Sequence, residues 1–333
     1  MDFKSILRTF VKVFIPLAFG CLLLWYLYRE MDFQEIFEVI KKGVRYDIIF
    51  LSLFFGLGAN IIRSYRWGLL IESLGERFKT SNIIYAVLGN YALNLVLPRV
   101  GEVWRCGVIT RYEKISFTKL LGTLFVDRIS DSIMVGLITL FIFIFNFSFF
   151  SRFLAKNPAL FDGFQSIFNS IWIYVVGVIL VVAIWFVFKY MSHFTLVQKA
   201  KNMFKNIWEG IKSIWLMKRK GLFLLQTLFI WVGYFCYFYI TFYAFDFTRD
   251  LGVGVGLIAF TMSSIGVAVP VQGGIGPWHF MVIATLVLFG VKETDAAAFA
   301  LVVHTVQTVW TGLCGLFGII ALPIANKEYK SAA

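Results

Sequence analysis

The chain has 333 residues, of which 59% are hydrophobic and only 15% are charged, whereas soluble domains carry charge on roughly a quarter of their residues. A water-soluble enzyme is therefore disfavoured, and 38 Phe residues and a mean hydropathy of +0.80 indicate that lipid surrounds most of the surface. The formal net charge of +12 indicates basic cytoplasmic loops that face anionic lipid head groups, rather than a nucleic-acid partner.

Membrane-spanning helices are predicted from apolar segments of roughly 20 residues, the length that crosses a bilayer core. The first such segment follows basic residues and ends in an aromatic group typical of the membrane interface, and it lacks a small-residue cleavage site. We interpret it as a retained span rather than a secretory signal. Six segments are long enough: residues 10–28, 47–70, 119–148, 169–188, 221–245 and 295–322. The sequence therefore predicts an all-α, polytopic membrane helical bundle.

Two further apolar segments, residues 81–112 and 253–290, are interrupted near their middle by Pro and Gly. The first is broken at Leu97–Gly101 and the second at Pro270–Pro277. Their arms are short for complete spans, so we expect each segment to be a re-entrant hairpin that enters and leaves on one side of the membrane. The predicted fold then has six full spans and two re-entrant broken-helix hairpins, or eight transmembrane segments in all.

This layout predicts both topology and internal symmetry. It places roughly two thirds of the 31 Lys and Arg residues on the side of the N-terminus, so the positive-inside rule predicts that both termini are cytoplasmic. The order span, span, hairpin, span occurs in residues 10–148 and again in 169–322, which predicts an inverted repeat within a single membrane domain, 1–333. Interrupted segments at corresponding places in inverted halves indicate a transporter's binding site.

Segments 30–46 and 189–220 have apolar residues at helical spacing, and are either amphipathic helices on the membrane surface or solvated linkers.

Charged residues inside the apolar segments are concentrated in the first half of the chain. A charge at the bilayer centre costs roughly 2.5–3.5 kcal/mol on translocon scales, so these residues need partners or a function. They form two groups, one following the break of the first hairpin and one in the next span: Arg99, Glu102 and Arg105, and then Asp127, Arg128 and Asp131. Three of the six are positive and three negative. They either pair with one another as a structural anchor or bind a ligand.

The break of the second hairpin supplies the remaining candidates for a ligand site: Gln272, Gly273, Gly274, Gly276 and His279. Helices that start near Val100 and at Pro277 would both direct their N-terminal ends into the membrane interior, where free N–H groups favour an anion. The glycines would let the backbone approach a ligand, although they could equally serve close helix packing. Arg99 could bind a phosphate through two hydrogen bonds. We therefore expect an anionic phospholipid head group in a polar cavity near the bilayer midplane.

Several of these motifs together resemble a known family. The segment Leu97–Glu102 with Arg105, the run from Asp127 to Asp131, and Pro270–Gly276 resemble the three signatures of the flippase-like lysylphosphatidylglycerol synthase transmembrane-region family. Arg63–Trp67 is similar to its Arg-rich, Trp-containing element. The resemblance covers nearly the whole chain.

The resemblance implies a multi-pass protein of the bacterial cytoplasmic (inner) membrane that handles lipid. In fused members this region translocates an aminoacylated phosphatidylglycerol between leaflets. This chain departs from the family pattern at two positions. His279 stands where the family commonly has an acidic residue. Asp127 stands at the head of the family's Glu-Arg-x-x-Asp element, which is a milder change because the residue stays acidic. The expectation of a cationic lipid group beside His279 is therefore not carried over.

The leading hypothesis is a lipid translocator, flippase-like or scramblase-like, that acts on an anionic or modified phospholipid without catalytic residues, cofactor or metal. The four cysteines are scattered singly, without the spacing of a metal site. A lipid head-group-modifying enzyme is the first alternative, but the longest loop is too short for a catalytic domain and no activated nucleophile is evident. A separately encoded modifying enzyme and a second copy of the chain are conceivable partners. The second alternative is a non-transporting scaffold.

Overall fold

The computed structural model describes residues 3–29, 31–157 and 217–327, together with isolated positions between 170 and 198. Every regular element in these ranges is helical. Four segments are long and apolar enough to cross a membrane: α3 (Tyr46–Glu72), α6 (Phe117–Phe145), α11 (Lys220–Tyr239) with its 3-10 continuation η1 (Ile240–Ala244), and α15 (Glu293–Ala325). These segments coincide, within a few residues, with four of the predicted spans, and the polytopic all-α fold is confirmed.

Of the other two predicted spans, the structure describes the first in full and the second only at isolated positions. The first lies inside a continuous helix, α1 (Phe3–Tyr28). The predicted span 169–188 and the amphipathic segment 189–220 lie outside the described ranges, apart from isolated positions. The segment 30–46 does contain a helix, α2 (Phe33–Gly43), whose Ile36 is buried while Phe33 and Phe37 are exposed.

Two pairs of shorter helices fold back at the predicted Pro and Gly breaks. They are α4 (Thr80–Val96) with α5 (Val100–Glu113), and α13 (Val253–Ala268) with α14 (Pro277–Leu288), the second break holding the 3-10 turn η2 (Gln272–Gly274). Pro98 disfavours the helical conformation for Leu97, which is extended at φ −136° and ψ 116°, so α4 ends there. Pro277 takes the first position of α14, as predicted.

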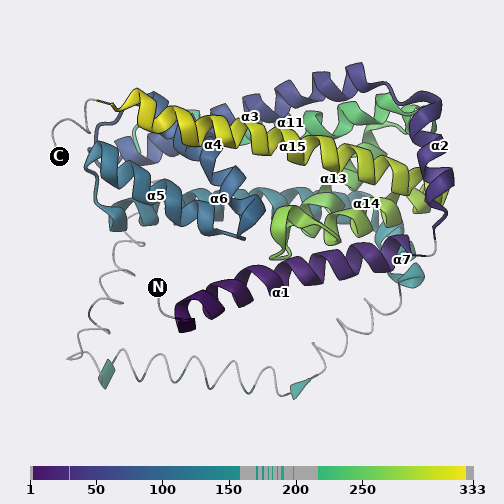
Figure 1. Ribbon diagram of the computed structural model, residues 1–333, viewed down its shortest axis with the longest axis horizontal. Helices are drawn as coiled ribbons and strands as arrows, with labels where there is room; N and C mark the ends of the chain where they lie inside the picture. The colour runs from purple at the N-terminus through teal and green to yellow at the C-terminus, as the bar shows by residue number, and fades with distance from the viewer. Residues whose placement is uncertain are drawn as a thin grey trace.

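Each hairpin occupies one end of the elongated bundle, and the two tips meet near its middle (Figure 1). The open end of the first hairpin is closed by a hydrogen bond from Asn82 at the start of α4 to Glu113 at the end of α5. At the tips, η2 packs on α4, and a Cβ atom on Gly273 would lie 3.2 Å from the Leu95 side chain. The helix that borders this junction is α1, whose Gly20 packs on Ile275.

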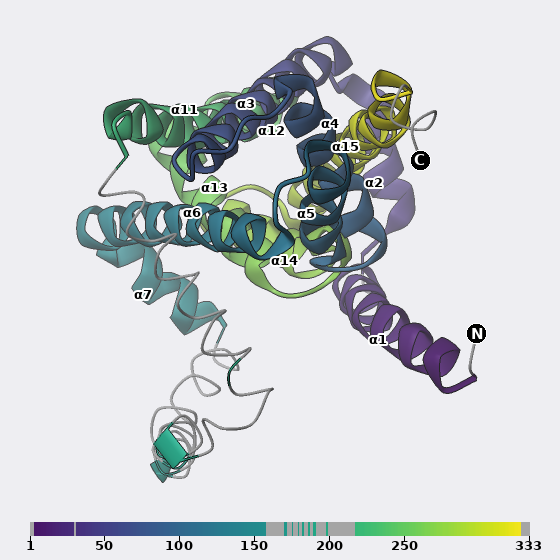
Figure 2. The same cartoon turned by 90° about the vertical axis from the view of Figure 1, so that its left-hand side faces the viewer.

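The two halves of the described chain repeat one order of elements: a span, a hairpin and a second span. The first spans of the two halves, α3 and α11, lie side by side (Figure 2) and run antiparallel, because Gly56 contacts Tyr237 whereas Ala59 contacts Gly233. Antiparallel equivalent helices are what halves of opposite orientation require. The inverted repeat over 10–148 and 169–322 stays a prediction, because the helix that would begin the second half lies outside the described ranges.

The end of the predicted span 119–148 is more complex than expected. The helix α6 stops at Phe145, and after Asn146 a separate helix, α7 (Phe147–Lys156), begins. This helix is amphipathic and buries Phe149 and Phe153 against α13 and α14. The short helix α12 (Asp246–Arg249) similarly follows η1 at the end of the α11 span.

Candidate functional site

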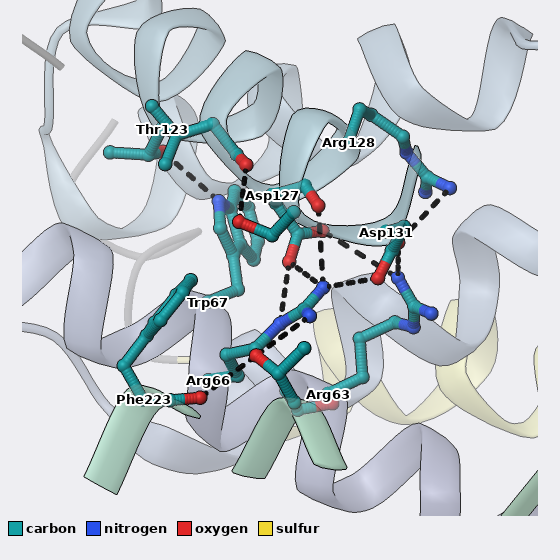
Figure 3. A network of polar contacts seen from close by, with 12 residues as sticks. Arg63, Arg66, Trp67, Thr123, Asp127, Arg128, Asp131 and Phe223 are labelled. Atoms are coloured by element: carbon teal, nitrogen blue, oxygen red, sulfur yellow. Dashed lines mark hydrogen bonds and ion pairs between the residues drawn. The ribbon is translucent and has the colours of Figure 1, made fainter. Parts of the chain in front are cut away.

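The span α3 contributes two buried arginines that bind the carboxylates of α6 (Figure 3). Arg66 donates through Nη2 to Oδ1 of Asp127 at 2.6 Å and to Oδ1 of Asp131 at 2.8 Å, and its Nε donates to Asp127 at 3.1 Å. Arg63 donates to Asp131 and lies 3.8 Å from Asp127. The two carboxylates reach the same partners because residues four apart share one face of a helix.

The first hairpin contributes a third arginine to the same carboxylate. Arg105 donates through Nη2 to Oδ2 of Asp127 at 3.1 Å, and its guanidinium lies 4.5 Å from the ring centroid of Trp67, a cation–π contact. Trp67 is held in turn by a hydrogen bond from Nε1 to Thr123 Oγ1 at 3.0 Å. One helical turn before Arg105, Glu102 pairs with Arg128 at 3.2 Å. Helices α3, α5 and α6 are therefore joined by ion pairs.

These ion pairs define the charged cluster, which consists of Arg63, Arg66, Glu102, Arg105, Asp127, Arg128 and Asp131. Four arginines face three carboxylates, so the cluster has one positive charge in excess. Its members are graded in exposure: the side chain of Asp127 is 0% exposed, that of Asp131 13%, that of Glu102 20% and that of Arg128 34%. The cluster is sealed around Asp127 and open at Arg128.

Several buried polar atoms beside the cluster have no hydrogen-bond partner among the described residues. They include Nε and Nη1 of Arg105, Nη2 of Arg128, and both side-chain amide atoms of Asn90. The backbone of Asn90 packs against α5, because a Cβ on Gly101 would lie only 2.0 Å from the Asn90 backbone carbonyl oxygen, and Arg105 is one turn further along that helix. Unpartnered buried donors are costly, so this region favours additional acceptor oxygens.

Two tyrosines extend the polar region toward α4 and α11. Arg63 Nε donates to Tyr234 Oη at 3.2 Å, and Tyr234 donates to Asn60 Oδ1 at 2.6 Å. The hydroxyl of Tyr91 lies 3.1 Å from that of Tyr234 and is its donor, because the proton of Tyr234 is already directed at Asn60. Both hairpin helix α4 and span α11 are thereby connected to the charged cluster.

The candidates of the second hairpin form a separate group at its tip. Gly273, Gly274 and Gly276 all have positive φ angles, of 58°, 75° and 90°, which explains the need for glycine there. His304 Nε2 lies 2.9 Å from the carbonyl oxygen of Gly273 and must donate to it. The ring of His279 is buried and packs on that of His304 with centroids 4.5 Å apart. Gln272 is also buried in this turn.

The structure thus gathers Glu102, Arg105, Asp127, Arg128 and Asp131 but leaves the sixth charged candidate outside. Arg99 is exposed, caps the N-terminus of α5 with a left-handed backbone (φ 65°), and makes no ion pair with a described residue. Sequence reasoning did not include Arg63 and Arg66 among the site residues. The available signal was their position inside an apolar span, where an arginine needs a partner.

No group of three metal-ligating side chains occurs among the residues that the structure describes. The helical bundle with its apolar spans and ion pairs at membrane depth defines a multi-pass membrane protein. Residues 13–315 match the family described as "Lysylphosphatidylglycerol synthase TM region", and the chain belongs to that family. The family resemblance predicted from the motifs is confirmed, and it connects the protein with lipid metabolism or lipid translocation. The sequence matches no individual curated protein.

Proposed function

We propose that the protein is a lipid translocator that moves an anionic or modified phospholipid between the leaflets of the bacterial inner membrane. The observation that carries the proposal is the charged cluster: it is buried at Asp127, accessible at Arg128, and one positive charge in excess. A purely structural ion network would be expected to balance its charges, since an unpaired charge inside a membrane is costly. An anionic head group supplies the missing negative charge.

The open edge of the cluster has the chemistry of a phosphate site. The side chain of Arg128 is 34% exposed as a whole, but its Nη2 is buried and has no partner among the described residues. Guanidinium groups bind phosphate oxygens through two parallel hydrogen bonds. Helix α5 begins at Val100, so its positive dipole end lies at the tip of the hairpin, next to the exposed Arg99. The N–H groups of Val100 and Gly101 already donate to Leu97 O and to Asn94 Oδ1, so they are not the free donors that the sequence predicted. The tip group of Gln272, Gly273, Gly274, Gly276 and His279 borders the other side of the proposed head-group path.

The proposal also covers the membrane topology of the chain and the source of the modified head group. The hairpins are re-entrant, both termini are cytoplasmic, and the protein is no enzyme, so any modified head group comes from a separately encoded enzyme. Expression with a fluorescent or periplasm-active reporter at the C-terminus tests the orientation. If the chain alone changed a lipid head group, the alternative of a head-group-modifying enzyme would replace the translocator.

Reconstituted liposomes test the central claim. Purified protein is incorporated with fluorescent phosphatidylglycerol, and leaflet exchange is followed by quenching of the outer leaflet. Arg128→Gln should lower the exchange rate about tenfold or more, because a hydrogen bond to a charged group contributes about 1.5–3 kcal/mol. Arg152→Gln on the exposed face of α7 is the matched control and should leave the rate unchanged.

The result that overturns the proposal is equally plain. If wild-type protein exchanges lipid no faster than empty liposomes, the protein is a scaffold and the cluster is architecture. If exchange occurs but Arg128→Gln and Arg152→Gln are alike, the head group does not pass the charged cluster.

A further inference from the structure

An apolar groove lies between the spans α3 and α15, over the hairpin helix α4. Its volume is about 390 Å³, within the range of roughly 300–1,000 Å³ that small-molecule ligand sites occupy. Each of the three helices contributes apolar side chains to its wall: Leu57 and Ile61 from α3, Ile84 and Leu88 from α4, and Leu313 and Phe317 from α15. The charged cluster and its tyrosines do not line it, so the groove is distinct from the proposed head-group site.

The groove leads toward the polar region along one side of α4. Ile84, Leu88 and Tyr91 are spaced by four and three residues, so they lie on the same face of the helix. Ile84 and Leu88 line the groove, whereas the hydroxyl of Tyr91 donates to Tyr234, which binds Arg63 of the charged cluster. Within two helical turns the surface changes from apolar to polar, as an amphipathic ligand requires.

A buried donor marks the same end of the groove. Trp310 lines the groove from α15, and its Nε1 is buried without a hydrogen-bond partner among the described residues. Helices α4 and α15 run antiparallel, since Gly318 packs on Tyr85 and Gly312 on Leu95. Trp310 therefore lies toward the hairpin tip, as Tyr91 does. An indole N–H is a donor only, and a carbonyl oxygen is its natural acceptor.

We propose that this groove binds an acyl chain of a diacyl glycerophospholipid whose head group lies at the charged cluster, with Trp310 donating to the ester carbonyl. The inference rests on the proposed function, because it assigns the position of the apolar part of the same lipid. The occupant follows from the two ends of the groove: the apolar walls accommodate a hydrocarbon chain, and the Trp310 N–H at the polar end donates to an ester oxygen. A lipid bound in this way enters from the membrane between α3 and α15.

Photocrosslinking with a matched pair of variants tests the groove. The full-length protein is placed in nanodiscs containing phosphatidylglycerol with a diazirine in one acyl chain, and crosslinked peptides are identified by mass spectrometry. Leu313→Trp fills the groove, whereas Leu316→Trp adds the same bulk on the same helix outside it, and the two leucines are 55% and 53% exposed. In wild type, crosslinks should concentrate on the groove walls of α4 and α15.

Leu313→Trp should lower the crosslink yield in the groove and the leaflet-exchange rate several-fold, and Leu316→Trp should change neither. Trp310→Phe keeps the aromatic ring but removes the N–H, and should weaken lipid retention about threefold to tenfold, as expected for one neutral hydrogen bond. Equal thermal unfolding of the variants establishes that they fold.

The outcomes separate the two proposals. If the groove crosslinks as expected but wild type exchanges no lipid, the acyl-chain site stands and translocation is refuted. If wild type exchanges lipid but the crosslinks spread evenly over all lipid-facing helices, or the two tryptophan variants behave alike, the acyl-chain site is refuted and translocation stands.

Discussion

Neutralising Asp127 should be among the most destabilising single changes in the charged cluster. Its side chain is 0% exposed and lies 2.6 Å from Arg66, 3.1 Å from Arg105 and 3.8 Å from Arg63. Asp127→Asn keeps the shape but raises the excess charge of the cluster from one to two. Removing one partner of a buried ion pair costs about 3–5 kcal/mol, and we expect the free energy of unfolding to fall by that amount.

An exposed ion pair supplies the control. Asp47 is 68% exposed and pairs with Arg45 at 3.2 Å, so Asp47→Asn should cost about 1 kcal/mol or less. Unfolding by sodium dodecyl sulfate in mixed micelles, followed by helical circular dichroism and tryptophan fluorescence, measures both. Combining Asp127→Asn with Arg105→Met should cost less than the sum of the single changes by about 0.5–3 kcal/mol, because the two side chains interact. Equal costs for Asp127→Asn and Asp47→Asn would refute the sealed, ion-paired centre described above.

Two further predictions concern the first hairpin and its attachment. Gly101→Ala should prevent the tip from closing and sharply lower the yield of folded protein, because the new Cβ would lie 2.0 Å from the Asn90 carbonyl oxygen. The control is Gly107→Ala on the same helix, whose Cβ meets nothing within 4 Å and which should be neutral or stabilising by up to about 1 kcal/mol. Thermal unfolding in detergent measures both variants. Asn326→Ala removes two hydrogen bonds with Asn82, of 2.7 and 3.1 Å, that tie α15 to α4, and should cost about 1–3 kcal/mol in the same assay. The loss should be smaller when Asn82 is already Ala, where only the bond from Asn326 to the Leu322 carbonyl oxygen is left to lose.

The helix boundaries around the breaks could be predicted because they depend on local chemistry. Pro98 excludes a helical Leu97, Pro277 suits the first turn of a helix, and the glycines at the second tip take positive φ angles. The four clear spans could be predicted from length and hydropathy for the same reason. The separate helix after Asn146 could not, because its aromatic residues continue the apolar run of the preceding span.

The membership of the charged cluster could be predicted only in part. Asp127 and Asp131 share a face of α6 by their spacing, but which helix presents its arginines to that face depends on tertiary packing. Arg63 and Arg66 proved to be the partners, and Arg99 did not, because it stands at the left-handed cap of α5 with an exposed side chain. Spacing along one helix carries no information about neighbours on another.

All members of the charged cluster lie between residues 63 and 131, whereas α11 starts only at Lys220. A ribosome that has delivered α6 to the translocon has therefore already synthesised both members of every pair. The three carboxylates can balance three of the four arginine charges during insertion, at a stage when each isolated charge would cost roughly 2.5–3.5 kcal/mol at the bilayer centre. Biogenesis of the N-terminal helices does not have to wait for the C-terminal half, whose Tyr234 and Thr227 add their hydrogen bonds to Arg63 and Arg66 afterwards.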